Sequence, residues 1–540
     1  MDEVFVFTLA CGQCLALQVA KDVQIYGMAP PLLLSLVLAA AIVWSHLSSS
    51  ESALLSLAAS ALVVLGAHGS QSNHVLLEAI VMLAVLLTAP APPWLSRGGS
   101  ITQGDEERRR EWSTRLTLAM RTVLCALYAV TGFAKLNDAW HDPHRSCCVQ
   151  MFVGLWAMFA DVQLLPPLML RLIPYLATAF ELGFALALLP ILVLEATAWR
   201  PNRLLRVLAV LGAGFHACIA LPPPPISVYP FSMLMVPIYV SSLIPHEARW
   251  AALSVSTWAH HTHALVAAVV SIAVAVAFYS TRAGRYFEYP PYFSWELGVL
   301  WVLGAFGSLA TVAVAAPAAA LAEVATPVAR QGLVRMSLAL FPAACILAIG
   351  SSTYLSVRTY PSFAMFSNLL IEGGASNHWL VRAPEAWAGL VPREYGPHDA
   401  IEILETDLPS LRHLQINLAP LLPVGVLDAF RLANVSAEFH ITPPAWGYAP
   451  TEPFRPFAVP VVEVRRRLSV ASQSRRDYFL RFREAGVHAM HAVGAIHEHR
   501  RRGGVLMAGS NASLEQPLPS FRAWLHRYRT FDLGYSPCRH

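Results

Sequence analysis

The chain has 540 residues with 38 Lys and Arg against 34 Asp and Glu, so its formal net charge is only +4 and provides no long-range field for nucleic acid. Charged residues make up 13% and hydrophobic residues 56%, whereas soluble domains average about 25% and about 45–50%. This composition excludes a plain soluble enzyme. It also excludes a disordered chain, because disorder requires low hydrophobicity and high net charge.

Residues 1–30 form an apolar segment that begins with acidic Asp2 and Glu3 and contains Gln13 and Gln18. A secretory signal peptide would begin with basic residues. We therefore predict an interfacial helix or an extra membrane span for this segment, rather than a cleaved signal.

Residues 31–356 contain repeated apolar stretches long enough to cross a bilayer, which takes about 20 residues per helix. The segment 151–170 differs, because Asp161 and the pair Pro166-Pro167 interrupt it, and it suits a re-entrant or interfacial position. The predicted fold class is an all-α multi-pass membrane helix bundle of about ten spans. These spans cover residues 31–47, 52–68, 75–92, 116–134, 173–196, 203–221, 229–244, 262–280, 295–322 and 333–356.

Residues 357–540 are predicted to form a small α+β domain. Its 184 residues hold 36 charged residues, as many as the first 356 residues together, which indicates a domain outside the bilayer. Residues Val459–Val464 are expected to be extended. A helix is expected from Arg475 to about Val493, with Tyr478, Phe479, Phe482 and Ala485 on one face.

The side of the membrane follows from the Lys and Arg residues in the loops. One set of alternate loops carries 11 of them and the other set 5, so the richer side is expected to be cytoplasmic. The tail then lies on the lumenal or extracellular side, in the endoplasmic reticulum or another secretory-pathway membrane. N-glycosylation sequons at Asn434 and Asn511 agree with this side.

Cysteine usage adds one expectation about the same side. Cys147, Cys148 and Cys538 all fall on the predicted lumenal side, where the environment permits disulfides. One bridge between the vicinal pair and the tail is allowed by this arrangement.

Polar side chains at the spans are functional candidates, because ionisable groups are costly in lipid. The predicted topology places Asn73, His74, Lys135, Glu181 and His216 near the same, lumenal, edge. Burial disfavours the charged form of a lysine, so an uncharged amine faced by two imidazoles would serve as a general base. Simpler readings are that the lysine snorkels to the headgroups, that the histidines are core residues and that the glutamate pairs with a neighbouring helix.

The run Tyr128-Ala-Val-Thr-Gly-Phe-Ala-Lys-Leu-Asn-Asp-Ala-Trp140, preceded by Asn73-His74 and followed by Phe215-His216, resembles a known family. The family comprises the vitamin K-dependent gamma-glutamyl carboxylases and the wider group of proteins with a horizontally transferred transmembrane (HTTM) domain. The resemblance covers roughly residues 30–250.

The resemblance implies a role for each matched residue. Lys135 would be the base that deprotonates reduced vitamin K. Asn73, His74, His216 and Trp140 would contact the quinone, and Glu181 would orient the base or hold a neighbouring helix.

The resemblance also implies a lyase that uses a reduced, vitamin K-like quinone and oxygen to carboxylate glutamate in a lumenal protein substrate. The carboxylases carry a larger lumenal region that binds a propeptide, and no part of this tail matches it. Two alternatives stay open: a non-enzymatic membrane transporter or lipid-binding subunit, and a prenyl-chain cyclase in the same pocket. No metal site is predicted, because the tail residues His488, His491, His497 and His499 suit a solvated helix end better than a tetrahedral site.

Overall fold

The computed structural model describes part of the chain. The predicted spans 31–47, 262–280 and 295–322, the segment 1–30, and 52–68 except Ala58 and Ala59 lie outside it. The described residues are 58–59, 73–89, 103–194, 202–222, 226, 228–243, 333–355, 362–364, 367–371, 376–381, 400–412, 414, 416–417, 422, 424–436, 439–441, 456–485, 495–516 and 538–539.

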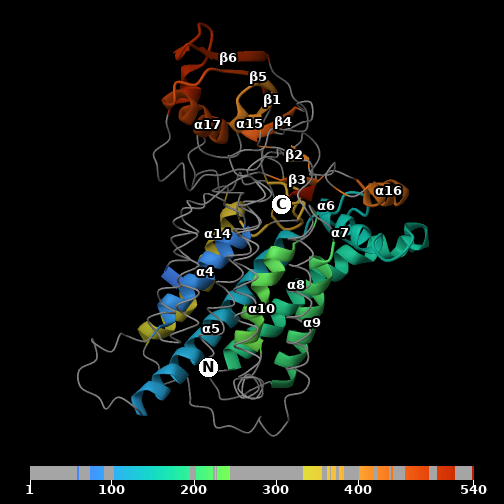
Figure 1. Ribbon diagram of the computed structural model, residues 1–540, viewed down its shortest axis with the longest axis vertical. Helices are drawn as coiled ribbons and strands as arrows, with labels where there is room; N and C mark the ends of the chain where they lie inside the picture. Colours follow the sequence, from blue (N-terminus) through green and yellow to red (C-terminus); the bar gives the residue numbers. More distant parts are fainter. Residues whose placement is uncertain are drawn as a thin grey trace, which may run out of the picture.

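The described part of the first 356 residues is a helical bundle (Figure 1). Four of its helices contain stretches long and apolar enough to cross a membrane, namely Glu111–Ala134, Pro167–Val193, Arg203–Ala220 and Ser337–Tyr354. The structure therefore supports a mostly helical membrane protein with four candidate spans, and the expected number of about ten is not confirmed. The long helices are α4 (Asn73–Thr88), α5 (Gln103–Ala134), α8 (Pro167–Leu194), α9 (Asn202–Ala220), α10 (Tyr229–Leu243) and α14 (Leu333–Tyr354).

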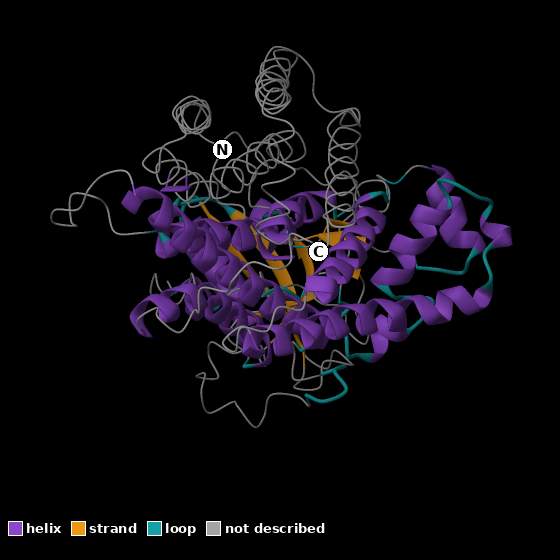
Figure 2. Cartoon of the chain, turned by 90° about the horizontal axis from the view of Figure 1, so that it is seen from below, coloured by secondary structure: helices purple, strands orange, loops and turns teal. Residues whose placement is uncertain are grey.

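Helix α5 is the centre of the bundle and contacts α4, α8, α10 and α14; Figure 2 shows the described helices gathered together when seen along the bundle. In lipid, helices associate through close packing at small residues. A Cβ atom at Gly132 would lie 2.9 Å from Leu182 Cγ, and one at Gly212 would lie 2.7 Å from the Tyr239 hydroxyl. These glycines therefore allow α5 to approach α8, and α9 to approach α10.

The segment between α5 and α8 leaves the bundle sideways (Figure 1). It contains α6 (Asp138–His141), α7 (Cys147–Trp156) and the short 3-10 helix η2 (Val162–Leu164), and Figure 1 shows α7 beside the upper end of α8. Helix α8 then begins at Pro167, a residue favoured in the first turn because it has no N–H to satisfy.

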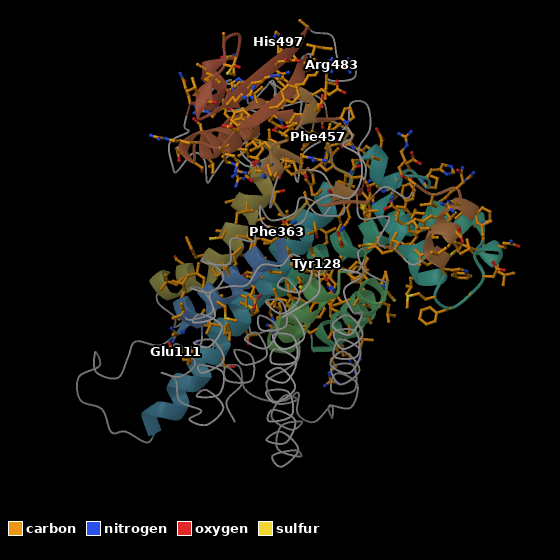
Figure 3. All side chains as sticks on the ribbon, turned by 45° about the horizontal axis from the view of Figure 1, so that its top comes forward. Glu111, Tyr128, Phe363, Phe457, Arg483 and His497 are labelled. Atoms are coloured by element: carbon orange, nitrogen blue, oxygen red, sulfur yellow. A yellow bond between two sulfur atoms is a disulfide. The ribbon has the colours of Figure 1, made fainter. Side chains whose placement is uncertain are left out.

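The described part of the tail forms two small sheets and four short helical elements above one end of the bundle (Figure 1). The larger sheet is antiparallel with the order β4-β1-β5-β6-β7, and the smaller has the order β2-β3-β8. Figure 3 shows Arg483 and His497 in the larger sheet, with Tyr128 and Glu111 progressively further down the bundle. The elements are β1 (Ala400–Thr406), α15 (Pro409–Arg412), β2 (Ile416–Asn417), α16 (Val424–Leu432), β3 (Phe439–Ile441), β4 (Phe457–Pro460), α17 (Val461–Gln473), β5 (Tyr478–Ala485), β6 (Ile496–Arg502), β7 (Val505–Leu506), η9 (Ala512–Glu515) and β8 (Cys538–Arg539).

Two local predictions in the tail are wrong. Residues 459–464 are not extended throughout, because strand β4 ends at Pro460 and helix α17 follows with Glu463 in its first turn, where a negative charge is favourable. The expected helix from Arg475 is instead strand β5 over Tyr478–Ala485. Tyr478, Leu480 and Phe482 are buried at every second position, a period of two that fits a strand.

The histidines of the tail change their setting accordingly. His497 and His499 lie on strand β6 rather than on a helix end, while His488 and His491 lie outside the described residues. His499 is fully buried, and its Nε2 lies 2.9 Å from the hydroxyl of Tyr478.

The tail is joined to the region between α5 and α8 by a disulfide and by a shared core. Cys147 at the start of α7 is bonded to Cys538 on β8, so the predicted bridge between the vicinal pair and the tail is confirmed at Cys147. Helix α16 packs on α7, and Phe430, Val426 and Val153 belong to one buried core. Cys148 stays a free thiol.

We expect the disulfide to be specific for the first cysteine of the vicinal pair. Peptide mapping without reductant should recover a Cys147–Cys538 cross-linked peptide from the parent and from Cys148→Ser. Because the bond closes a very long loop, Cys538→Ser should destabilise the protein by about 2–5 kcal/mol. A cross-link from Cys148 to Cys538, or free thiols at all three positions, would contradict this pairing.

Acid should destabilise the tail through Glu463, which is 1% exposed and bonded to Arg466 and Arg467. Burial alone would raise the pKa of this carboxyl, but the two arginines outweigh it and lower the pKa from 4.5 to about 2. A carboxyl with a depressed pKa stabilises the fold above its unfolded pKa and loses that contribution as the pH falls through its folded pKa. The free energy of unfolding of the parent protein should therefore fall by about 3 kcal/mol as the pH is lowered from about 4.5 to about 2.

Thermal unfolding across this pH range checks the prediction. Glu463→Gln should already be destabilised at pH 7 and should show a flatter pH profile than the parent, whereas Glu484→Gln, at an exposed site, should follow the parent. Parallel pH profiles for Glu463→Gln and the parent would rule this carboxyl out as the acid-sensitive group.

Candidate functional site

The site begins where helix α5 ends. Lys135 follows the last helical residue in a hydrogen-bonded turn, in which its N–H donates to the carbonyl of Gly132 at 3.2 Å. Asn137 then fixes the turn. Its Oδ1 accepts the N–H of Trp140 at 2.8 Å, while its Nδ2 donates to the carbonyls of Ala134 and Ser367 at 2.9 and 2.7 Å. Residues 132–140 therefore form the end of helix α5 and a turn that Asn137 caps.

Residues 376–381 hold this turn in place. The Nε2 atom of His378 lies 2.9 Å from the carbonyl of Phe133, and the N–H of Trp379 donates to the carbonyl of Leu136 at 2.8 Å. The indole N–H of Trp379 donates to Asp138 at 2.8 Å. These contacts support the backbone around Lys135, and none of the residues 376–381 lines the cavity described below.

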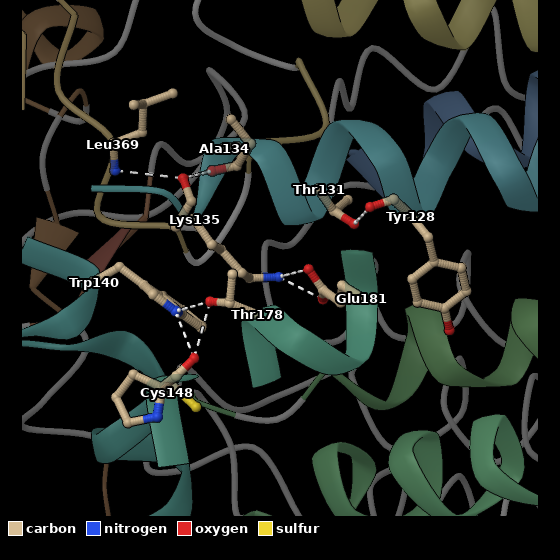
Figure 4. Close-up of polar contacts among 12 residues, drawn as sticks. Tyr128, Thr131, Ala134, Lys135, Trp140, Cys148, Thr178, Glu181 and Leu369 are labelled. Atoms are coloured by element: carbon tan, nitrogen blue, oxygen red, sulfur yellow. Dashed lines mark hydrogen bonds and ion pairs between the residues drawn. The ribbon is translucent and has the colours of Figure 1, made fainter. Parts of the chain in front are cut away.

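Lys135 and Glu181 form a buried ion pair between α5 and α8. The Nζ atom lies 2.5 Å from each carboxylate oxygen, and the two residues are 7% and 6% exposed. Figure 4 shows Lys135 reaching from the end of α5 to Glu181 on α8. Because a lone charge is very costly away from water, each partner is the reason that the other can be buried.

Trp140 completes the surroundings of the lysine. Nζ of Lys135 lies 5.1 Å from the centroid of the Trp140 ring, within the range of a cation–π contact. The indole N–H donates to Thr178 Oγ1 at 2.9 Å and lies 3.2 Å from the carbonyl of Pro174. Helix α8 therefore holds both the carboxylate and the ring that face the amine (Figure 4).

A second polar cluster surrounds His216, which is fully buried on α9. Its Nε2 lies 2.9 Å from the hydroxyl of Tyr128, and its Nδ1 lies 3.2 Å from Ser232 Oγ. The hydroxyl of Tyr128 also contacts that of Tyr239 on α10. This cluster connects α5, α9 and α10 through hydrogen bonds. Its imidazole and the phenol of Tyr128 line the cavity that also contains Lys135 and Glu181.

A cavity of about 340 Å³ lies between these two clusters. Lys135, Glu181, His216, Tyr128, Trp140 and the thiol of Cys148 contribute to its lining, and most of the remaining wall is apolar. Leu176 on α8 and Cys218 on α9 line it and are exposed, so the cavity opens sideways between these helices. Its volume falls in the usual range for small-molecule sites, about 300–1,000 Å³.

The structure brings together four of the residues singled out in the sequence, namely Lys135, Glu181, His216 and Trp140. Among the described side chains, the amine of Lys135 contacts the Glu181 carboxylate, and His216 lies on the same cavity. His74 belongs to α4, and its side chain lies outside the described residues.

Asn73 is the clearest correction among the expected quinone contacts. Its Oδ1 accepts the backbone N–H groups of Ser362 and Phe363 at 2.9 and 2.7 Å, and the residue does not line the cavity. Phe363 has a positive φ of 57°, which is uncommon for a bulky residue. Asn73 thus anchors the segment after α14, and its acceptor oxygen is used by the backbone.

Sequence reasoning missed Tyr239, Ser232 and Thr178, and it considered Cys148 only as a disulfide candidate. A phenol inside an apolar span needs a hydrogen-bond partner, and this rule could have marked Tyr239 as a member of a polar cluster. The partners themselves come from other helices and could not be read from local sequence.

No family model, no curated protein and no solved structure matches this chain. The geometry of the cavity is therefore the basis on which a function can be assigned.

The ion pair predicts a non-additive stability pattern. Lys135→Met or Glu181→Met alone should destabilise the protein by about 3–5 kcal/mol, because each leaves an unpaired buried charge, whereas the double substitution should be close to neutral. Thermal unfolding of the purified protein measures the coupling, with Arg171→Met at an exposed position of α8 as the control. Additive effects of the two single substitutions would show that the pair is not coupled.

Proposed function

We propose that this chain is a membrane-embedded, vitamin K-dependent carboxylase-like enzyme that acts on a quinol or another isoprenoid-type lipid. The observation that carries the proposal is the buried Lys135–Glu181 pair in the wall of an otherwise apolar cavity that opens sideways. Such a site suits a ligand with one ionisable head and a large apolar part, because the head meets the charges and the rest meets hydrocarbon.

The pair can accept a proton from the ligand by either of two routes. The Glu181 carboxylate can take the proton of a ring hydroxyl while the ammonium of Lys135 stabilises the resulting oxyanion. If the pair first becomes neutral by internal proton transfer, the amine of Lys135 takes the proton instead. Both routes end with a protonated carboxyl, an ammonium and an oxyanion, so charge and protons balance in each. General base catalysis of this kind contributes about 10²–10⁴-fold to a rate.

His216 and Tyr128 supply the other polar contact for the ligand. The hydrogen bonds to Tyr128 and Ser232 hold the imidazole in place, so its orientation is fixed before a ligand binds. A reduced quinone would supply, on reaction with oxygen, the strong base that the resemblance to the carboxylases implies. The residues of this chain bind that ring, orient its hydroxyls and hold the first proton.

The same proposal includes a tail on the lumenal side of a secretory-pathway membrane, where a protein substrate could reach the tail domain. The Cys147–Cys538 disulfide supports an oxidising compartment. Asn434 and Asn511, the two sequon residues, are exposed, as glycosylation requires. The arginine-rich loops predicted to be cytoplasmic agree with this orientation.

Oxidation of a reduced naphthoquinone by the purified protein in nanodiscs tests the function. Lys135→Ala and Glu181→Gln should each lower the rate by about 100-fold or more. Lys135→Arg separates the two routes: it should be inactive if the amine takes the proton, because arginine is not deprotonated in proteins, and should keep activity if Glu181 takes the proton and residue 135 supplies only a positive charge. Arg145→Lys, at an exposed position outside the cavity, is the control.

The outcomes separate the proposal from its alternatives. Lys135→Ala and Glu181→Gln variants that oxidise the quinol like the parent would end the assignment of the base. Lipid binding without turnover in the parent would favour the non-enzymatic lipid-binding or transport reading, and a cyclised prenyl product without oxygen consumption would favour the cyclase.

A further inference from the structure

His378 joins the segment after helix α14 to the end of helix α5 through both of its ring nitrogens. The residue is 6% exposed, and its ring packs against those of Phe133 and Tyr354, with centroids 4.6 and 5.4 Å away. Its Nε2 lies 2.9 Å from the carbonyl oxygen of Phe133, and its Nδ1 lies 3.1 Å from the backbone nitrogens of Leu380 and Val381. One buried imidazole therefore bonds to two stretches of backbone.

The partners of the imidazole fix where it carries its hydrogen. A carbonyl oxygen only accepts, so Nε2 must carry the hydrogen that is donated to Phe133. A backbone N–H only donates, so Nδ1 must be the unprotonated nitrogen that accepts from Leu380 and Val381. These contacts are all satisfied by the neutral imidazole with its hydrogen on Nε2.

Protonation of the ring would break one half of this arrangement. A hydrogen on Nδ1 would face the N–H groups of Leu380 and Val381, and both of these bonds would be lost. The bond to Phe133 would remain, because Nε2 donates in the neutral and in the charged imidazole.

The same segment holds the turn that carries the lysine of the ion pair. Two backbone hydrogen bonds flank His378: the N–H of Trp379 donates to the carbonyl of Leu136 at 2.8 Å, and the N–H of Asp138 donates to the carbonyl of Asn377 at 3.2 Å. Loss of the bonds at Nδ1 would release the backbone directly after Trp379. It would therefore loosen the support of the turn and change where the lysine amine lies.

The other titratable groups around this histidine cannot give the same response. His141 stacks on Trp379 with ring centroids 4.5 Å apart, but its Nδ1 donates to the carbonyl of Asn137 and would do so in both protonation states. Asp138 accepts the indole N–H of Trp379, and Tyr354 contributes a phenol beside the imidazole. Carboxyl and phenol groups ordinarily titrate outside the pH range of imidazole. The Lys135–Glu181 pair lies on the cavity, which His378 does not line.

We propose that His378 is a positioning residue that makes the reaction depend on pH: its neutral imidazole holds the turn of Lys135 in place, and its protonation in a mildly acidic compartment releases this turn. The inference rests on the proposed function for the reaction that is regulated, whereas the response of the turn requires no reaction.

The direction of the response follows from the burial of the ring. Burial lowers the pKa of His378 below its ordinary value, and the hydrogen bond to the carbonyl of Phe133 opposes this shift. Because the pKa is depressed in the folded protein, the contacts of the neutral ring contribute fully above the unfolded pKa of about 6.5. Their contribution is lost as the pH falls through the folded pKa.

Two substitutions separate the roles of the two ring nitrogens. In His378→Asn, the amide oxygen replaces Nδ1 as an acceptor for the backbone N–H groups and does not titrate. In His378→Gln, the amide nitrogen replaces Nε2 as the donor to Phe133, but the acceptor is lost, as it is in the protonated ring. His497→Gln, at an exposed position of strand β6, is the control.

Quinol oxidation by the full-length protein in nanodiscs is measured at pH values of about 7.5 and about 5, above the range in which Glu463 acts. The ion pair is the same in all variants, so the ratio of the parent rate to the His378→Asn rate isolates the imidazole. This ratio should fall by about threefold or more at the lower pH. His378→Gln should be slower than His378→Asn at both pH values, and His497→Gln should follow the parent. A ratio that does not change with pH would overturn the proposal.

Hydrogen exchange followed by mass spectrometry reports the turn without any reaction. After correction for the intrinsic effect of pH on exchange, peptides covering residues 136–141 and 376–381 should exchange faster at the lower pH in the parent but not in His378→Asn. Equal protection of the parent at both pH values would overturn the positioning role, even where quinol oxidation depends on Lys135. An acid response of these peptides in a protein that does not oxidise a quinol would contradict the proposed function alone.

Discussion

The arrangement of the described bundle around its cavity depends on one ion pair, between Lys135 at the end of α5 and Glu181 on α8. Neither charge is affordable in an apolar setting without the other, so α5 and α8 must meet at this depth. Gly132 permits the approach because a side chain there would collide with Leu182. Asn137 fixes the turn that follows, and this turn directs the lysine toward α8.

The surroundings of the pair limit the chemistry that it can perform. The carboxylate of Glu181 accepts hydrogen bonds from the Lys135 ammonium. A second polar cluster at His216 lies on the same cavity, with the orientation of its imidazole set by Tyr128 and Ser232. Apolar walls fill most of the remaining lining. Such a cavity suits a ligand with a proton-donating head and an apolar body, which is the combination that the proposed lipid quinol has.

The sequence was sufficient to predict that Lys135, Glu181 and His216 lie near one another, because ionisable groups within apolar spans stand out by their cost. It was not sufficient for Asn73, whose partners are backbone N–H groups 289 and 290 residues further along the chain. Strand β5 was misread for a related reason. Tyr478, Phe479 and Phe482 fit a helical period locally, and only the pairing of β5 with β1 and β6 settles the strand. Contacts distant in sequence account for both errors.

Isotope-edited difference infrared spectroscopy can show whether the ion pair accepts the proton, because it reports the protonation state of Glu181 when a reduced quinone binds. We expect a protonated carboxyl band to appear on binding, to shift with labelled glutamate and to be absent in Glu181→Gln. An unchanged carboxylate band, with the quinol bound and still fully protonated, would contradict the assignment of this ion pair as the proton acceptor.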